Sequence, residues 1–170
     1  MKLIACVDAD YRDHEAVTAI VGVRDWTDAT PAIERVVRSP HAPAPYAPGE
    51  FYRRELPGIL AALAALAAAS SDASVVVIDG YVWLGGARPG LGARLHDALG
   101  GAVPIVGVAK TPFRDNDRAA AVVRGGSARP LFVTAAGMDL QTATAHVTRM
   151  HGPHRLPTIL KRADRLARDA

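Results

Sequence analysis

The sequence lacks features that define several classes of protein. Cysteine occurs once in 170 residues, at Cys6, which excludes an internal disulfide and a zinc site built from several thiolates. No apolar run reaches the roughly 18 residues that a transmembrane helix needs. The N-terminal segment meets an acidic residue, Asp8, too early for a signal peptide. These absences predict a cytoplasmic protein without membrane segments, in which oxygen ligands hold any metal ion.

The chain also has little net charge. A formal charge of +3, from 20 basic and 17 acidic residues, is too small to demand a nucleic-acid partner. The bases are mostly arginine, which forks onto phosphates but whose abundance can equally reflect genome composition. Residues 149–170 carry six basic and two acidic side chains. This segment predicts either a solvated helix face or a surface that faces phosphate groups.

Length and composition predict a single domain spanning residues 1–170. Hydrophobic residues make up 49% of the chain and charged residues 22%, so the chain can bury a core. Continuous β-branched runs at 75–78 and 103–108 predict strands buried on both faces. A helix between them makes the two strands parallel. The fold class is therefore α/β, with a mixed sheet flanked by helices.

The remaining elements follow from hydrophobic spacing. Residues 32–38 are assigned to a strand, although their spacing also fits one helical turn, and the prolines from Pro40 to Pro48 exclude regular structure there. The other expected strands are 3–7, 16–23, 119–123 and 130–134, and the expected helices are 55–70, 91–99, 140–150 and 158–167.

Acidic residues follow two of the expected strands. Asp8 ends the first strand and Asp79 ends the strand at 75–78, while Glu55 begins a helix and Asp164 lies in the last one. In open α/β sheets, functional groups gather at the carboxyl ends of strands. If these carboxylates converge, their repulsion requires a divalent cation such as Mg²⁺. The sequence thus indicates metal-dependent phosphoryl chemistry.

Each of these acids also has a plainer interpretation. An aspartate after a strand is often a turn residue or a helix cap, which would suffice for Asp8 and Asp79. Glu55 favours a helix N-terminus in any protein. Asp164 is spaced to pair with Lys161 or Arg168 on the helix surface.

Longer motifs reduce this ambiguity. Together, in this order and spacing, they resemble the endonuclease V family: Val7-Asp8-Ala9-Asp10-Tyr11, Pro45-Tyr46-Ala47-Pro48-Gly49 followed by Glu55, Val77-Ile78-Asp79-Gly80, Val106-Gly107-Val108-Ala109-Lys110, Arg129-Pro130-Leu131-Phe132-Val133, and Arg155-Leu156-Pro157 followed by Ala163-Asp164. The resemblance implies a ribonuclease H-like fold. It also implies Mg²⁺-dependent nicking of nucleic acid at the second phosphodiester 3′ of deaminated adenine, with Mn²⁺ able to substitute.

The resemblance assigns roles to residues of the chain. Asp8, Glu55 and Asp79 match metal-binding carboxylates, and Asp164 matches the last acidic position of the family. Lys110 matches a lysine beside the active site, where its ammonium would hold the scissile phosphate or the attacking water. A solvated strand end is the alternative for Lys110.

Substrate-binding residues are also implied by the resemblance. Tyr46 and Pro48 match a wedge, in which an aromatic ring on a stiffened loop replaces a base that is extruded from the duplex. Gly49 and Gly80 match positions where the backbone approaches that base, because glycine has no Cβ. The alternative for the loop is a proline-rich crossing with Tyr46 packed inward.

Three segments depart from the family pattern. Val82 replaces a glycine after the Asp79–Gly80 pair and no histidine follows, a Pro-Gly-His element is missing at 134–138, and Thr158-Ile159 replaces Glu-Pro. These departures concern substrate recognition. They leave open a nucleic-acid-binding protein of the same fold with weak or altered-specificity cleavage, and a protein that shares only the fold and binds a small phosphate compound. The expected partner is DNA with a deaminated base, and the expected state is a monomer.

Overall fold

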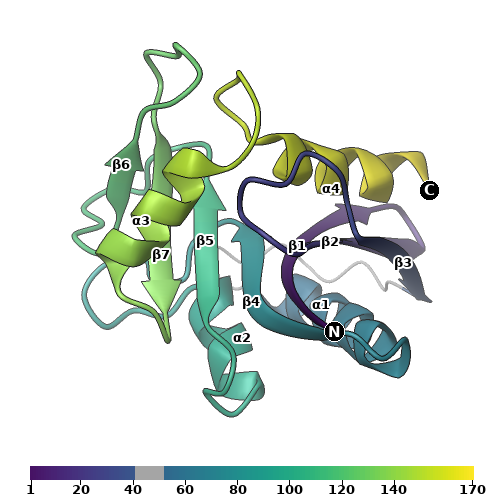
Figure 1. Cartoon of the computed structure of the whole chain (residues 1–170). Coiled ribbons are helices and arrows are strands. Elements are labelled where there is room, and N and C mark those ends of the chain that lie inside the picture. Colours follow the sequence, from purple (N-terminus) through teal and green to yellow (C-terminus); the bar gives the residue numbers. More distant parts are fainter. Residues whose placement is uncertain (41–51) are drawn as a thin grey trace.

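The computed structural model describes residues 1–40 and 52–170. Within them, seven strands form one sheet in the order β3-β2-β1-β4-β5-β7-β6 (Figure 1). The strands are β1 (Lys2–Tyr11), β2 (Glu15–Val23), β3 (Ile33–Pro40), β4 (Asp72–Asp79), β5 (Ile105–Ala109), β6 (Ala120–Val122) and β7 (Leu131–Ala136). The helices are α1 (Tyr52–Ala68), α2 (Leu91–Ala98), α3 (Leu140–Arg149) and α4 (Thr158–Asp169).

The first three strands form an antiparallel meander, which confirms the strands expected at 3–7 and 16–23 and the strand assignment at 32–38. β1 pairs with β2, and β2 pairs with β3. The expectation that Pro40 lies outside regular structure is wrong, because Pro40 is the last residue of β3, opposite Glu15. β3 is an edge strand, where a proline that cannot donate a hydrogen bond is tolerated.

The centre of the sheet is parallel and sets the position of two carboxylates. β1 is parallel to β4, with Val7 opposite Ile78, and β4 is parallel to β5. Asp8 and Asp79 therefore lie side by side, just past the end of the ladder between β1 and β4. The expectation that Asp8 ends the first strand is wrong, because β1 continues along β2 to Tyr11. β7 runs antiparallel to β5 and to β6, so the sheet is mixed as expected.

Helix α1 begins earlier than hydrophobic spacing predicted. It starts at Tyr52 and not near Glu55, and Glu55 lies in its first turn. Pro57 is consequently inside the helix. The apolar repeat that marks this helix begins only at Leu56, so the polar first turn carries no periodic signal.

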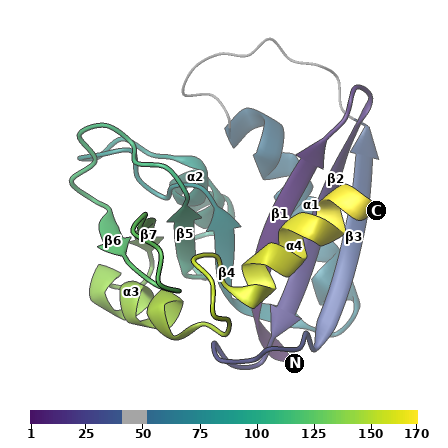
Figure 2. The ribbon, with the colours of Figure 1, turned by 90° about the horizontal axis from the view of Figure 1, so that it is seen from above.

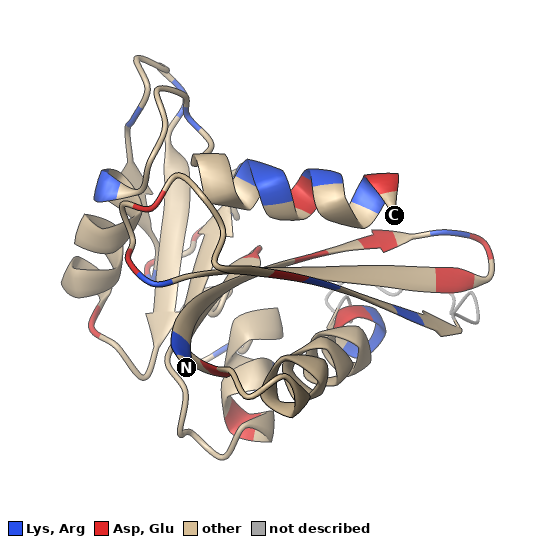
Figure 3. Ribbon diagram, turned by 45° about the vertical axis from the view of Figure 1, so that its right-hand side comes forward, with Lys and Arg blue, Asp and Glu red and all other residues tan. Residues whose placement is uncertain are grey.

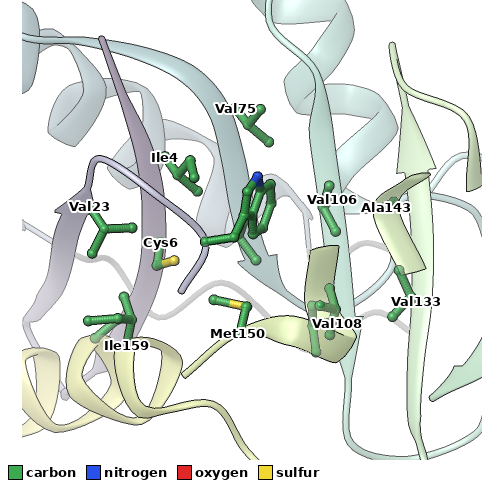
Figure 4. Close-up of a cluster of buried hydrophobic side chains, with 14 of the residues drawn as sticks. Ile4, Cys6, Val23, Val75, Val106, Val108, Val133, Ala143, Met150 and Ile159 are labelled. Atoms are coloured by element: carbon green, nitrogen blue, oxygen red, sulfur yellow. The ribbon is translucent and has the colours of Figure 1, made fainter. Parts of the chain in front are cut away.

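Alternating side chains build two hydrophobic cores, one on each face of the sheet. Ile4, Cys6 and Val77 point to the face covered by α3 and α4 (Figure 4). Their neighbours Ala5 and Ile78 point to the opposite face, covered by α1 and α2 (Figure 2). Strands buried on both faces explain the continuous apolar runs of β4 and β5.

Helix α4 is fixed across the N-terminal strands by arginines. Arg12, in the turn between β1 and β2, donates to the carbonyls of Ala167, Arg168 and Ala170 at the end of the helix. Arg162 forks onto Glu34 of β3 with N–O distances of 2.6 and 2.9 Å. Basic and acidic positions alternate along α4 (Figure 3). Within the described ranges, no helix has the length and apolar character to cross a bilayer.

Candidate active site

Three carboxylates from distant parts of the chain line one cavity. The cavity has a volume of about 150 Å³ and lies at the end of the ladder between β1 and β4. Asp8 and Asp79 come from these two strands, and Glu55 comes from the first turn of α1. The floor is apolar, formed in part by Ile59 and Ile78. The three acids that the sequence singled out therefore line one cavity, and their assignment as metal ligands stays a prediction.

The negative charges of these carboxylates repel one another. Burial and the nearby Asp79 raise the pKa of Asp8 to about 6. Burial, then Asp8 and Asp79, raise the pKa of Glu55 to about 7. Both groups therefore bind protons far more readily than exposed carboxylates. This is the electrostatic condition that an added cation relieves.

Lys110 lies beside these acids, one residue past the end of β5. Its Nζ donates to Oδ2 of Asp79 at 2.7 Å, and both side chains are about 40% exposed. Burial lowers the pKa of Lys110, but the hydrogen bond and the charge of Asp79, with Asp8 and Asp164, raise it by more. Lys110 and Asp79 also line a second, smaller hollow together with Asp8 and Leu156. Lys110 is thus part of the site and not merely a solvated strand end.

Asp164 lies near the site and pairs with a residue of its own helix. Its carboxylate pairs with Arg168 one turn further along α4, as the plainer interpretation of the sequence suggested. It still acts on Asp8 and Lys110 through its charge. However, it does not line the cavity that Asp8, Glu55 and Asp79 share.

Carboxylate oxygens are suitable ligands for a divalent cation, but the three carboxylates of the cavity are too far apart in this structure to enclose one. Among residues 1–40 and 52–170, no three His, Cys, Asp or Glu side chains lie close enough to enclose a metal ion. The ammonium of Lys110 donates a hydrogen bond to one carboxylate oxygen of Asp79, and the guanidinium of Arg168 donates one to the carboxylate of Asp164. A cation at this site would therefore compete with basic groups of the chain for the same oxygens.

The loop after Asp79 packs closely against strand β5. Gly80 adopts a φ of +129°, a conformation that glycine permits, and its amide donates to Val108. In β5, a Cβ on Gly107 would lie 2.5 Å from the carbonyl oxygen of Gly80, so only glycine lets the loop cross this strand. Gly80 itself has open space around its absent Cβ.

The departures from the family pattern in this loop differ in their effect. Val82 is fully buried, and its amide donates to Oγ1 of Thr134. Trp83 donates from its indole to the carbonyl of Ala135. Only Tyr81 is directed toward the strand end that carries Lys110, where its hydroxyl donates to the carbonyl of Thr111 at 2.6 Å. The side chain of Val82 therefore belongs to the core.

Sequence reasoning missed some residues of the site. Tyr11 lines the carboxylate cavity, and burial together with Glu55 raises its pKa. Its only sequence signal was its position at the end of the first motif. Leu156 and Leu160 wall the smaller hollow from the side of α4.

The predicted wedge residues Tyr46, Pro48 and Gly49 lie outside the described residues. The basic C-terminal segment, in contrast, is largely engaged within the chain. Arg162 pairs with Glu34, and Arg168 pairs with Asp164. These contacts favour a structural interpretation for that part of the segment.

Comparisons with known proteins agree on one family. Residues 1–131 match the sequence model of the family described as Endonuclease V. Endonuclease V of Streptomyces coelicolor is 31% identical over 184 residues, covering 96% of this chain and 77% of the relative. Endonuclease V of Streptomyces avermitilis is 29% identical over 184 residues, covering 96% and 78%.

Solved structures give the same result. The crystal structure of the Streptomyces avermitilis protein has a TM-score of 0.78 at 28% identity and covers 98% of this chain and 80% of that one. A structure of Ciona intestinalis Endonuclease V in complex with a 24mer DNA that contains an inosine followed by a ribo-adenosine has a TM-score of 0.84. It is 19% identical and covers 99% and 85% of the two chains, so this likeness concerns the fold.

Proposed function

The chain belongs to the endonuclease V family, and from this premise we propose that it nicks DNA beside deaminated adenine by hydrolysing a phosphodiester at the carboxylate cavity. The observation that carries the proposal is the convergence of Asp8, Glu55 and Asp79 on that one cavity. The nick is expected at the second phosphodiester 3′ of the lesion. A Ciona intestinalis relative has been solved with inosine-containing DNA, which supports inosine as the base to test first.

The family is metal-dependent, and we propose Mg²⁺ as the ion for this chain, with Mn²⁺ able to substitute. Asp8, Glu55 and Asp79 would hold it, because Mg²⁺ prefers carboxylates and retains water ligands and substrate phosphates. When bound, the ion lowers the pKa of its water and stabilises charge on the scissile phosphate. Asp164 would join the ligand set only after release from Arg168.

The side chains of this protein have separate tasks in the proposed reaction. Asp8 and Glu55 must lose their protons to accept a cation, since both have raised pKa values. Lys110 carries a positive charge at the rim of the cavity, 2.7 Å from Asp79. There its ammonium can donate to a phosphate oxygen and stabilise charge that develops during transfer. Lys110 would then exchange its contact with Asp79 for a contact with substrate.

Recognition of the base is assigned to Gly80, next to Asp79, and to the residues predicted from the loop motif. Gly80 has no Cβ and open space in front of it, so a base can approach its backbone. Tyr46 and Pro48 would fill the gap that the extruded base leaves, and Gly49 would let the backbone approach that base. A single domain, a monomeric state and a cytoplasmic location remain predictions from the sequence.

The test uses two end-labelled duplexes that differ only by inosine in place of adenine. Purified wild-type protein is expected to nick the inosine strand in millimolar Mg²⁺ or Mn²⁺, and to leave both strands intact in EDTA. Asp79→Asn should reduce the rate by at least about 100-fold. Asp97→Asn, which changes an exposed carboxylate on α2, is the matched control and should cleave at the wild-type rate.

Two outcomes distinguish the alternatives. Tight, salt-sensitive binding without any product would support the binding protein of the same fold. Cleavage of branched or single-stranded DNA with no preference for inosine would contradict the proposed substrate but would still support the proposal that the protein is a nuclease. An inosine-containing RNA strand in the same assay decides between DNA and RNA.

A further inference from the structure

Arg155 forms a clamp at the point where strands β5 and β7 separate. Its Nη2 donates to the carbonyl oxygen of Lys110 and also to that of Pro130, the latter at 2.7 Å. The paired register of the two strands ends with Ala109 opposite Phe132. Both carbonyls therefore lie just beyond the ladder, where sheet hydrogen bonds no longer fix the backbone. The guanidinium of Arg155 therefore supplies a hydrogen-bond donor to the backbone at both strand ends.

This clamp acts on the residue that carries the ammonium group of the site. The carbonyl that Arg155 holds belongs to Lys110, whose Nζ contacts Asp79 at 2.7 Å. A strand end without such a contact is more mobile than the strand itself. Fixing the main chain of Lys110 limits the positions that its ammonium can reach.

Arg155 is itself held by a second arginine. Arg124 is buried and donates to the carbonyls of Met150 at 2.5 Å and Gly152 at 3.1 Å. It also donates to the carbonyl of Arg155 at 3.5 Å. Gly125 packs so closely that a Cβ there would lie 2.5 Å from the amide nitrogen of Arg155. The main chain of Arg155 therefore packs directly against Gly125.

The segment that presents the clamp also forms part of the site. Leu156, the next residue, lines the same hollow as Asp8, Asp79 and Lys110. A displacement of Arg155 would therefore alter the wall of the site as well as the position of the lysine.

We propose that Arg155 is a positioning residue for the nuclease reaction, which holds Lys110 in register with Asp79 through the carbonyl of Lys110. The inference rests on the proposed function, because it assumes that Lys110 acts on the scissile phosphate. Arg155 makes no contact with the carboxylates in this arrangement, so it acts through Lys110 and not on the reacting atoms.

The first test is a double-mutant cycle on single-turnover nicking of the inosine duplex. Arg155→Ala should lower the rate about 10- to 100-fold, the usual effect of removing a residue that orients a catalytic group, with less than about a threefold change in KM. In a Lys110→Ala background, the same substitution should change the rate less than about threefold, because the group that it positions is absent. Arg155→Lys keeps the charge but loses the planar fork, and should lie between wild type and Arg155→Ala.

Matched controls separate positioning from stability. Arg24→Ala removes an exposed arginine at the opposite end of β1 and β2 and should retain the wild-type rate. Each variant is checked by thermal unfolding. If the losses caused by Arg155→Ala and Lys110→Ala multiply in the double variant, Arg155 acts independently of Lys110 and the inference is wrong.

A second readout does not depend on cleavage. The chain has three lysines, Lys2, Lys110 and Lys161, so ¹³Cε-lysine labelling gives few signals. The two ε protons of Lys110 should be inequivalent in the wild type, because its ammonium is held, and should merge in Arg155→Ala. If wild type does not nick inosine DNA, the proposed function fails, and this spectrum still decides whether Arg155 holds Lys110. Unchanged ε protons in Arg155→Ala would overturn the inference.

Discussion

Glu55→Gln should stabilise the metal-free protein at neutral to alkaline pH. The raised pKa of Glu55, about 7, measures how strongly the fold disfavours the ionised carboxylate. Each pKa unit corresponds to about 1.4 kcal/mol, so the ionised group costs the native state about 3 kcal/mol. Glutamine has nearly the same shape and carries no charge. Because Glu55 shares its repulsion with Asp8 and is partly solvated, we expect a gain of about 1–3 kcal/mol.

The pH dependence has a definite sign. The pKa of Glu55 is raised in the native state, so between about 4.5 and 7 the native protein binds more protons than the unfolded chain. Stability therefore falls as pH rises through this window, and the full cost is present above it. Glu55→Gln removes the contribution of Glu55 to this dependence, while the raised pKa of Asp8 leaves its own. The two proteins should be equally stable near pH 4 and should differ most near pH 8.

The assay is urea unfolding in EDTA, followed by the fluorescence of Trp26 and Trp83, at both pH values. Asp97→Asn is the control for loss of an exposed carboxylate and should change stability by less than about 0.5 kcal/mol. Added Mg²⁺ should stabilise wild type more than Glu55→Gln, since only the former keeps the full ligand set. A Glu55→Gln protein that is less stable than wild type in EDTA near pH 8 would refute this reasoning.

Three further substitutions test how the fold supports the site. Gly107→Ala places a methyl group 2.5 Å from the carbonyl oxygen of Gly80, so we expect a loss of about 1–3 kcal/mol in urea unfolding together with slower nicking; unchanged stability would contradict the close crossing. Val82→Ala removes fully buried volume and should cost about 2 kcal/mol in the same assay, whereas a neutral effect would mean that Val82 is not core. Arg12→Ala removes the donors at the end of α4 and should increase amide hydrogen exchange in the last turn of that helix; unchanged exchange would show that the contact contributes little.

The sequence indicated that Asp8 and Asp79 each follow an apolar strand run, and it left their convergence conditional on the two strands being neighbours. The parallel pairing of β1 with β4, which brings the two acids side by side, comes from the structure. The hydrophobic spacing of the helix at 55–70 predicted that Glu55 lies at the start of a helix, and the structure places it in the first turn of α1. These predictions depend on local periodicity and topology, which a single sequence contains.

Contacts between residues far apart in the chain could not be predicted in the same way. The hydrogen bond between Lys110 and Asp79 and the clamp from Arg155 to Lys110 join segments that share no periodic pattern. The burial of Val82 could not be predicted either, because an irregular loop has no periodic pattern that indicates which side chain turns inward. The sequence allowed Asp164 to be either a metal ligand or a partner of Lys161 or Arg168 on the helix surface. Only the side-chain geometry shows that it pairs with Arg168.

The most direct test of the central claim is a crystal structure of the protein grown with Mn²⁺, with anomalous scattering recorded at the manganese edge. The account predicts a peak inside the cavity, with oxygens of Asp8, Glu55 and Asp79 within about 2.3 Å of it and Lys110 displaced from Asp79. Active protein with no peak among these three carboxylates, or with manganese bound elsewhere, would contradict it.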